Sequence, residues 1–220
     1  MVKKILLSFK VKIYCFIQWL KEWKFYLNPK FLLFDLSFSF IYLFLNPYRI
    51  SRKFLEKKFD QKIYDYGETP LLEMEKIVKI LNLKKNATIL ELGSGRGKTS
   101  FWLNFFCKYN IIAIEQIPIF VNISNFFIKL FKVKKLKFLC LDMFEYEIKD
   151  IDVIYLYGTT LSDDKIQLLI NKFKKLPSYV KIITISYALD EYDKSFVCLK
   201  SFDISFAWGK TKAYLNMKRG

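Results

Sequence analysis

Histidine is absent from this sequence of 220 residues, and cysteine, glycine and proline are scarce. The lack of histidine excludes catalytic triads and metal sites built on imidazole, so any chemistry must use other side chains. The four cysteines lie far apart and form no CxxC pair. This spacing predicts no metal site and no disulfide framework, and it favours buried thiols in a reducing compartment.

Acidic residues are also in the minority, with 21 Asp and Glu against 37 Lys and Arg and a net charge of +16. The excess is uneven, because residues 1–62 alone carry a net charge of +9. A basic, apolar first quarter indicates an anionic neighbour, either a membrane or a nucleic acid. A compositional bias of the gene toward Lys, Ile, Phe and Asn explains the charge equally well.

Long uninterrupted apolar runs are missing too. Residues 31–45 are apolar at 12 of 15 positions, whereas a spanning helix needs about 20 apolar residues, and Asp35 lies inside the run. Lys10 and Lys12 interrupt the apolar start of the chain, and no cleavage site of small residues follows, so we expect no signal peptide. These features predict a cytoplasmic protein, at most peripheral on the inner face of a membrane.

Residues 1–62 form an N-terminal segment with three predicted helical pieces. Residues 1–28 place apolar side chains at spacings of three and four, flanked by lysines, which predicts an amphipathic basic helix. An apolar piece at 31–45 and a basic one at 48–62 follow. The pieces either pack as a cap on the next domain or lie in a membrane interface through residues 1–50, and the pattern does not choose between these arrangements.

Residues 63–220 alternate between helical and strand patterns. We expect helices at 71–82, 98–108, 118–131 and 163–175, and strands at 87–92, 111–115, 136–141, 153–156 and 181–186. The tail predicts two more strands, at 196–199 and 202–216, with no helix between them. This order indicates an α/β, Rossmann-like fold with a mostly parallel sheet and an antiparallel edge, preceded by N-terminal helices.

The chemistry centres on the sequence ELGSGRG at 91–97, where a buried strand enters a turn and a helix follows. Gly93, Gly95 and Gly97 allow unusual dihedrals and a close approach to a ligand, at the strand ends where such sheets bind ligands. A nicotinamide-binding fold could use a similar turn, but its spacing is G-x-G-x-x-G. Glu91 would also repel a pyrophosphate, whereas it suits a cationic ligand.

Acidic residues stand at the ends of the next two strands. Glu115 can accept both hydroxyls of a ribose. Asp142, followed by the apolar Met143, can bond an adenine amine and leave Met143 to pack on the ring. Each acid alone could merely cap a helix. Their order and spacing after the glycine turn make them a joint signal for a nucleoside ligand.

These motifs resemble those of the class I S-adenosylmethionine-dependent methyltransferases. The resemblance implies S-adenosyl-L-methionine as the cofactor and a seven-stranded sheet whose last strand is antiparallel. It assigns cofactor binding to Glu91, Gly93, Ser94, Gly95, Gly97, Glu115, Asp142 and Met143.

Three shorter motifs are similar to a narrower group, the small protein-lysine methyltransferases related to the mitochondrial enzyme that modifies the ATP synthase c-subunit. They are YGETP at 66–70, EQIP at 115–118 and FAWG at 206–209. Members of that group also carry a hydrophobic, membrane-associating N-terminal segment. Arg96 departs from the group, which often has an acid there, and YLYGTT at 155–160 lacks the motif of amide and adenine N-methyltransferases.

Methyl transfer from a sulfonium is an in-line displacement that needs alignment and a dry pocket more than acid–base groups. Tyr66, Glu68, Tyr157 and Thr159 are the candidate catalytic residues, with Glu68 as an acidic contact for a lysine ammonium. We therefore expect a methyltransferase that acts on a protein lysine. RNA or a small molecule as acceptor, and a non-catalytic membrane-associated module, are the alternatives; the intact glycine motif argues against the last.

Overall fold

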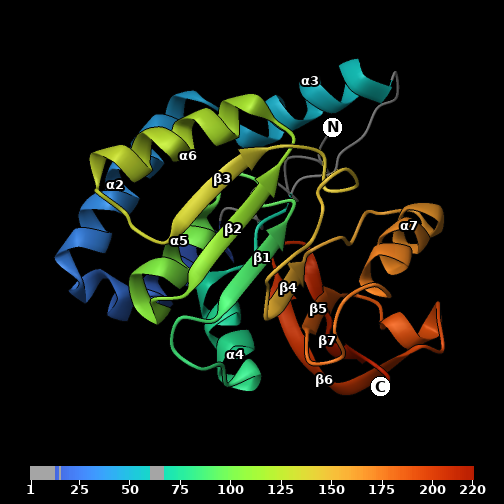
Figure 1. Ribbon diagram of the computed structural model, residues 1–220. Coiled ribbons are helices and arrows are strands. Elements are labelled where there is room, and N and C mark those ends of the chain that lie inside the picture. Colours follow the sequence, from blue (N-terminus) through green and yellow to red (C-terminus); the bar gives the residue numbers. More distant parts are fainter. Residues whose placement is uncertain (1–12, 15, 60–66) are drawn as a thin grey trace.

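A single seven-stranded sheet organises the chain (Figure 1). The computed structural model describes residues 13, 14, 16–59 and 67–220. The strands are β1 (Thr88–Leu92), β2 (Asn110–Glu115), β3 (Leu136–Cys140), β4 (Val153–Leu156), β5 (Lys181–Ile185), β6 (Phe196–Phe206) and β7 (Gly209–Lys218). Their order is β3-β2-β1-β4-β5-β7-β6; the first five are parallel, and β7 is antiparallel to both of its neighbours. The predicted α/β fold class is confirmed.

Helices cover both faces of the sheet. On one face lie α4 (Leu71–Leu81), α5 (Lys98–Trp102) with the π-helical turn η2 (Leu103–Cys107), and α6 (Pro118–Leu130). On the other lie α7 (Asp163–Phe173) and the short η3 (Leu189–Glu191). Side chains of β1 alternate between these layers, because successive residues of a strand point to opposite faces. Ile89 packs with the first group, and Leu90 and Leu92 pack with the second.

The described residues of the N-terminal segment form several helices separated by short breaks. Residues 13, 14 and 16–21 are α-helical, and the 3-10 turn η1 (Trp23–Leu27) follows. The prediction of one helix to residue 28 is therefore wrong at its end; residues 1–12 lie outside the described residues. Asn28 then begins α2 (Pro29–Phe44), because its side chain accepts hydrogen bonds from the amides of Lys30 and Phe31. After a break, α3 (Pro47–Phe59) follows, as predicted.

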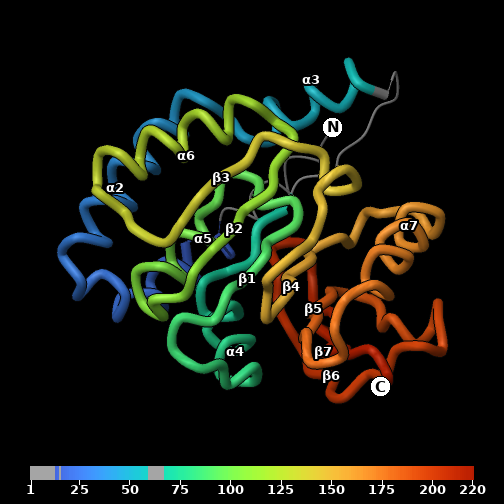
Figure 2. The backbone as a smooth tube through the Cα atoms, viewed as in Figure 1, coloured from blue at the N-terminus to red at the C-terminus, as the bar shows by residue number. Residues whose placement is uncertain are grey.

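One face of α2 is part of the core. Phe31, Phe34 and Phe38 are fully buried, and the rings of Phe34 and Phe101 lie 4.4 Å apart between centroids. Phe34 also contacts Phe127 of α6, so α2 and α6 lie side by side, as the backbone trace shows (Figure 2). This face of α2 therefore packs on α5 and α6 of the sheet domain. Within the described ranges no single helix is long and apolar enough to span a membrane; α2 and α3 pass that test only as a pair bent by 57°.

The C-terminal strands, the helix predicted at 98–108 and the cysteines also differ from the sequence predictions. The C-terminal strands form one long hairpin whose turn is at residues 207–208, because a bulge between Cys198 and Lys200 lets β6 continue where the pattern suggested a break. The helix predicted at 98–108 changes to π-helix after Trp102. The cysteines described are unpaired, but Cys140 is exposed and the other two are half-buried, so the expectation of buried thiols is wrong.

Candidate active site

A cavity of about 610 Å³ lies at the carboxyl ends of the parallel strands. Its size is that of a typical small-ligand site, about 300–1,000 Å³. Seven of the predicted site residues line it: Gly93, Gly95, Glu115, Asp142, Met143, Tyr157 and Thr159. A much smaller cavity behind the glycine loop is lined by Glu68, Glu91, Ser94 and Gly97, and it shares Gly93 and Tyr157 with the first. Tyr66 lies outside the described residues.

The glycine loop needs its glycines. Gly93, Gly95 and Gly97 all have positive φ, in the left-handed region that side chains disfavour. At Gly97 a Cβ would also come within 2.2 Å of the Phe138 ring. The amides of Gly93 and Ser94 both donate to the carbonyl of Ile114, at 2.9 Å. The loop is thereby held against the end of β2, and its backbone faces the cavity.

Glu115 joins that loop to the start of α6. Its Oε2 accepts from the Gly95 amide at 2.8 Å, and its Oε1 accepts from the Ile117 amide at 2.9 Å. Burial raises the pKa of the carboxyl, and the side chain is only 6% exposed. Each carboxylate oxygen has a second lone pair, so the group can still accept hydroxyl donors from the cavity that it lines.

Glu91 lies behind the glycine loop and is buried. Thr99 donates to Oε1 and Ser100 to Oε2, both from the first turn of α5. Burial raises the pKa of Glu91 to about 7. The carboxyl therefore joins the end of β1 to α5, and a direct contact with a cationic ligand stays a prediction.

Glu68 lies outside the large cavity. Both of its carboxylate oxygens accept hydrogen bonds from the Arg96 guanidinium. That guanidinium also lies over the Tyr42 ring, 4.5 Å from its centroid. The departure at Arg96 thus has a structural reason: the residue joins the glycine loop to α2 and to the segment before α4. Glu68 therefore serves the Arg96 pair in this structure, and a contact between Glu68 and a lysine ammonium stays a prediction.

An aromatic cluster closes the end of the cavity near β4. Trp208 Nε1 donates to Tyr157 Oη at 2.7 Å, and the Trp208 and Phe206 rings stack with centroids 5.1 Å apart. Burial raises the pKa of the Tyr157 hydroxyl, which keeps it protonated. A Cβ at Gly67 would come within 2.3 Å of Tyr157 Oη, so glycine there leaves room for the hydroxyl.

The cavity includes residues that the sequence did not single out. Trp208 belongs to the FAWG motif, which carried a family signal but no assigned role. Ser51 and Leu55 come from α3, more than thirty residues before the glycine loop, and Lys165 comes from α7. Within the described residues, no group of three metal-ligating acids or thiols comes together.

Comparison with known proteins places the fold. No protein-family model matches the sequence, and no curated protein matches it significantly. Among solved structures, an RNA methyltransferase from Salinibacter ruber in complex with S-adenosyl-L-homocysteine has a TM-score of 0.58 at 18% identity, over 70% of this chain and 95% of that one. Geranyl diphosphate C-methyltransferase from Streptomyces coelicolor A3(2) has a TM-score of 0.56 at 10% identity, over 68% and 79%.

A third similar structure is a mutant of MtNAS in complex with S-adenosylmethionine, with a TM-score of 0.57 at 13% identity. It is matched over 68% of this chain and 62% of its own, and the chain spans about 60% of the length of the MtNAS structures. These likenesses show that the chain has the Rossmann-like fold of the class I S-adenosylmethionine-dependent methyltransferases. Two of these proteins are named for different acceptors, RNA and geranyl diphosphate, so the fold leaves the acceptor open.

Proposed function

We propose that the chain is an S-adenosylmethionine-dependent methyltransferase whose acceptor is the side-chain amine of a protein lysine. The cofactor half of the proposal rests on the fit of the large cavity to a nucleoside ligand. Glu115 has lone pairs for ribose hydroxyls, Asp142 and Met143 line the same cavity as partners for an adenine amine and ring, and the loop at 93–97 offers close backbone approach. S-adenosylmethionine, when bound, supplies an electrophilic methyl group on a positively charged sulfur.

The acceptor half rests on one observation: Tyr157 and Trp208 line the same cavity, and the Phe206 ring packs against both. Aromatic faces attract ammonium groups, so the cluster suits the binding of a lysine side chain. The lysine ammonium would first lose a proton to water; the nitrogen lone pair would then form the N–C bond to the methyl group that the cofactor supplies, and the electrons of the S–C bond would stay on the sulfur. Tyr157 and Thr159 orient the amine by hydrogen bonds, with no histidine required.

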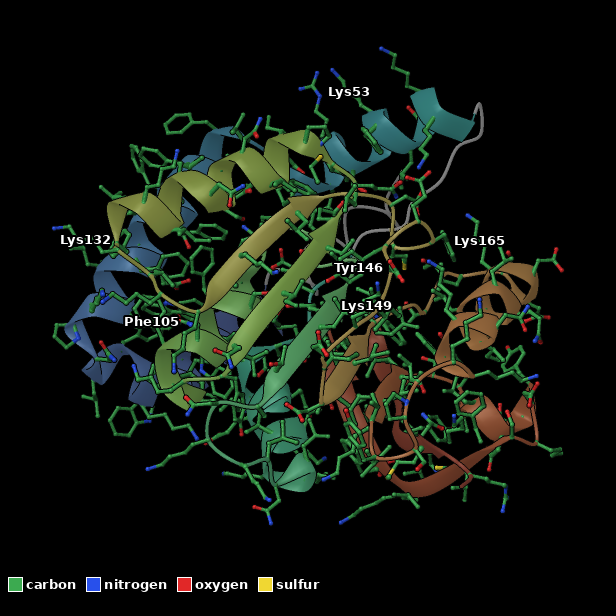
Figure 3. All side chains as sticks on the ribbon, in the orientation of Figure 1. Lys53, Phe105, Lys132, Tyr146, Lys149 and Lys165 are labelled. Atoms are coloured by element: carbon green, nitrogen blue, oxygen red, sulfur yellow. The ribbon has the colours of Figure 1, made fainter. Side chains whose placement is uncertain are left out.

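We also propose that the partner protein is met at an anionic membrane surface. The face of α2 opposite its buried phenylalanines forms an outer apolar stripe, defined as Leu33, Leu36, Phe40, Leu43 and Phe44, all more than half exposed. Exposed cations stand near both ends of the layer that α2 forms with α6, Lys53 beside one end and Lys132 beside the other (Figure 3). An apolar stripe between cations suits the interface of a bilayer with anionic lipid.

Label transfer tests the acceptor. Purified protein is incubated with methyl-labelled S-adenosylmethionine and a lysate that has been separated into membrane, soluble-protein and RNA fractions. We expect label in membrane protein, recovered as methyl-lysine after hydrolysis, and none with Gly95→Arg, which blocks the glycine loop. Label found only in RNA, the acceptor that the net charge of +16 would also suit, would replace the lysine proposal. Label only in small molecules would do the same.

A further inference from the structure

The helix α3 precedes all the sequence motifs of the sheet domain, but two of its residues line the cofactor cavity. Ser51 and Leu55 line the cavity, and both are buried. Lys58 follows Leu55 by three residues, so the three side chains share one face of the helix. This face of α3 is therefore a wall of the cavity, opposite the strand ends.

Lys58 connects α3 to the residues that follow two neighbouring strands, β2 and β3. Its Nζ lies 2.7 Å from Asp142 Oδ2 and 2.7 Å from Gln116 Oε1. Gln116 directly follows the ribose candidate Glu115, and Asp142 is the adenine candidate after β3. The other oxygen of Asp142 accepts from the Phe144 amide at 3.0 Å. Lys58 thus fixes the carboxylate in one orientation without filling the cavity, since Asp142 still lines it.

Charges from three elements face Asp142. They are Lys58 from α3, Glu115 from β2, and Lys165 and Lys172 from α7. Burial by itself raises the pKa of the Asp142 carboxyl, but the hydrogen bonds from Lys58 and the Phe144 amide outweigh burial and bring that pKa below its usual range. Of the three cations, Lys58 is the one that bonds the carboxylate directly.

We propose that Lys58 is a positioning residue for the cofactor: it holds Asp142 oriented and ionised toward the adenine amine, and it closes α3 over the adenosine end of the cavity. The inference rests on the proposed cofactor and is independent of the acceptor. It makes the N-terminal segment part of the cofactor site, in addition to being a cap on the sheet.

The test is cofactor binding by the full chain, measured by calorimetric titration with S-adenosylmethionine and separately with S-adenosylhomocysteine. Lys58→Met keeps the length of the side chain and removes its charge, and Lys57→Met removes the exposed neighbouring charge on the same helix. We expect Lys58→Met to weaken both ligands about tenfold, Lys57→Met to change neither more than about twofold, and Lys58→Arg to restore most of the affinity.

A pH profile separates positioning from a general loss of structure. Without Lys58 the Asp142 carboxyl takes up its proton at higher pH, and a neutral carboxyl accepts a weaker hydrogen bond. Between about pH 6 and pH 4 we expect the affinity of Lys58→Met to fall several-fold more than that of the wild type, because the ordinary aspartate pKa lies near 4. If Lys58→Met fails to fold, Lys58→Gln is titrated in its place.

The outcomes are distinguishable. If wild type and Lys57→Met bind the cofactor and the neutral Lys58 variant binds it equally tightly with the same pH profile, the role of Lys58 is refuted and the proposed function stands. If the folded wild type binds neither ligand, the cofactor assignment fails and the inference fails with it. Tighter binding by the neutral variant would also overturn the inference, since it would mean that Lys58 competes with adenine for Asp142.

Discussion

The Glu91 carboxyl is buried, and the hydroxyls of Thr99 and Ser100 donate hydrogen bonds to it. A buried carboxyl with a pKa raised from 4.5 to about 7 binds a proton more tightly in the folded state than in the unfolded state. Between these pH values the folded state therefore holds more protons, and stability falls as the pH rises. Below about 4.5 both states are protonated and the effect is fully favourable to folding.

The pH dependence of unfolding tests this environment. We expect the unfolding free energy of the wild type to drop by about 2.5 kcal/mol more between pH 5 and pH 8 than that of Glu91→Gln, which cannot ionise. Denaturant titration at both pH values measures the difference. The exposed Glu145→Gln should follow the wild type. An equal slope in wild type and Glu91→Gln would show that Glu91 is not held in a raised-pKa environment.

A substitution at Trp208 tests acceptor binding separately from cofactor binding. Trp208→Ala removes the stacking partner of Phe206 and the hydrogen bond to Tyr157. We expect kcat/KM for the labelled protein acceptor to fall about tenfold, with the dissociation constant of S-adenosylmethionine unchanged. Tyr179→Ala, at an exposed aromatic residue away from the cavity, serves as the control. A parallel loss of cofactor affinity would place Trp208 in the cofactor site instead.

At the scale of elements, α2 is joined to the sheet domain by charge as well as by phenylalanines. Asp35, an anomaly inside an apolar run of the sequence, is 4% exposed and lies 3.0 Å from Lys98 Nζ, at the start of α5. Tyr26 also donates to it at 3.0 Å. The carboxylate thus connects the N-terminal helices to the helix that follows the glycine loop.

Removing one partner of such a pair leaves the other partly buried and without its counter-charge. We expect Asp35→Asn to lower the unfolding free energy by about 2 kcal/mol, measured by denaturant titration. Ser39→Ala, at an exposed position of the same helix, should change it by less than about 0.5 kcal/mol. A cost at Asp35 no larger than that at Ser39 would mean that α2 is held by apolar packing alone.

Elements with a strong local pattern could be predicted from sequence, and those shaped by distant contacts could not. The strand Val153–Leu156 has the predicted bounds, because a short apolar run between polar residues is typical of a buried parallel strand. The course of β6 through its bulge depends on pairing with β7 and has no local signal. At the site, Glu115 ends β2 and Asp142 comes shortly after β3, positions that the strand pattern predicts, whereas Lys58 contacts Asp142 from 84 residues away in the sequence.

At the scale of the whole molecule, the outer apolar stripe lies on α2, whereas the cofactor cavity is lined by Ser51 and Leu55 of α3. Replacing Leu33, Phe40 and Phe44 together with serine should leave the core face of α2 intact, since these side chains are exposed. We expect at least a tenfold loss of binding to vesicles with anionic lipid, measured by flotation, with cofactor affinity unchanged.

Salt separates lipid from nucleic acid as the partner of this surface. Binding through apolar burial survives high salt, whereas binding to RNA falls steeply and log-linearly with salt concentration. Vesicle binding that is the same in wild type and the triple serine variant would refute the membrane proposal. Salt-sensitive binding to RNA with no binding to vesicles would assign the surface to RNA.

Calorimetric titration of the full chain with S-adenosylmethionine tests the central claim most directly, because it depends on neither the acceptor nor the membrane. We predict one saturable site per chain, with binding lost in Gly95→Arg and weakened in Asp142→Ala, while circular dichroism shows that both variants remain folded. A folded wild-type protein that gives no saturable binding, or a Gly95→Arg variant that binds as tightly as the wild type, would contradict the assignment of this cavity to the methyl donor.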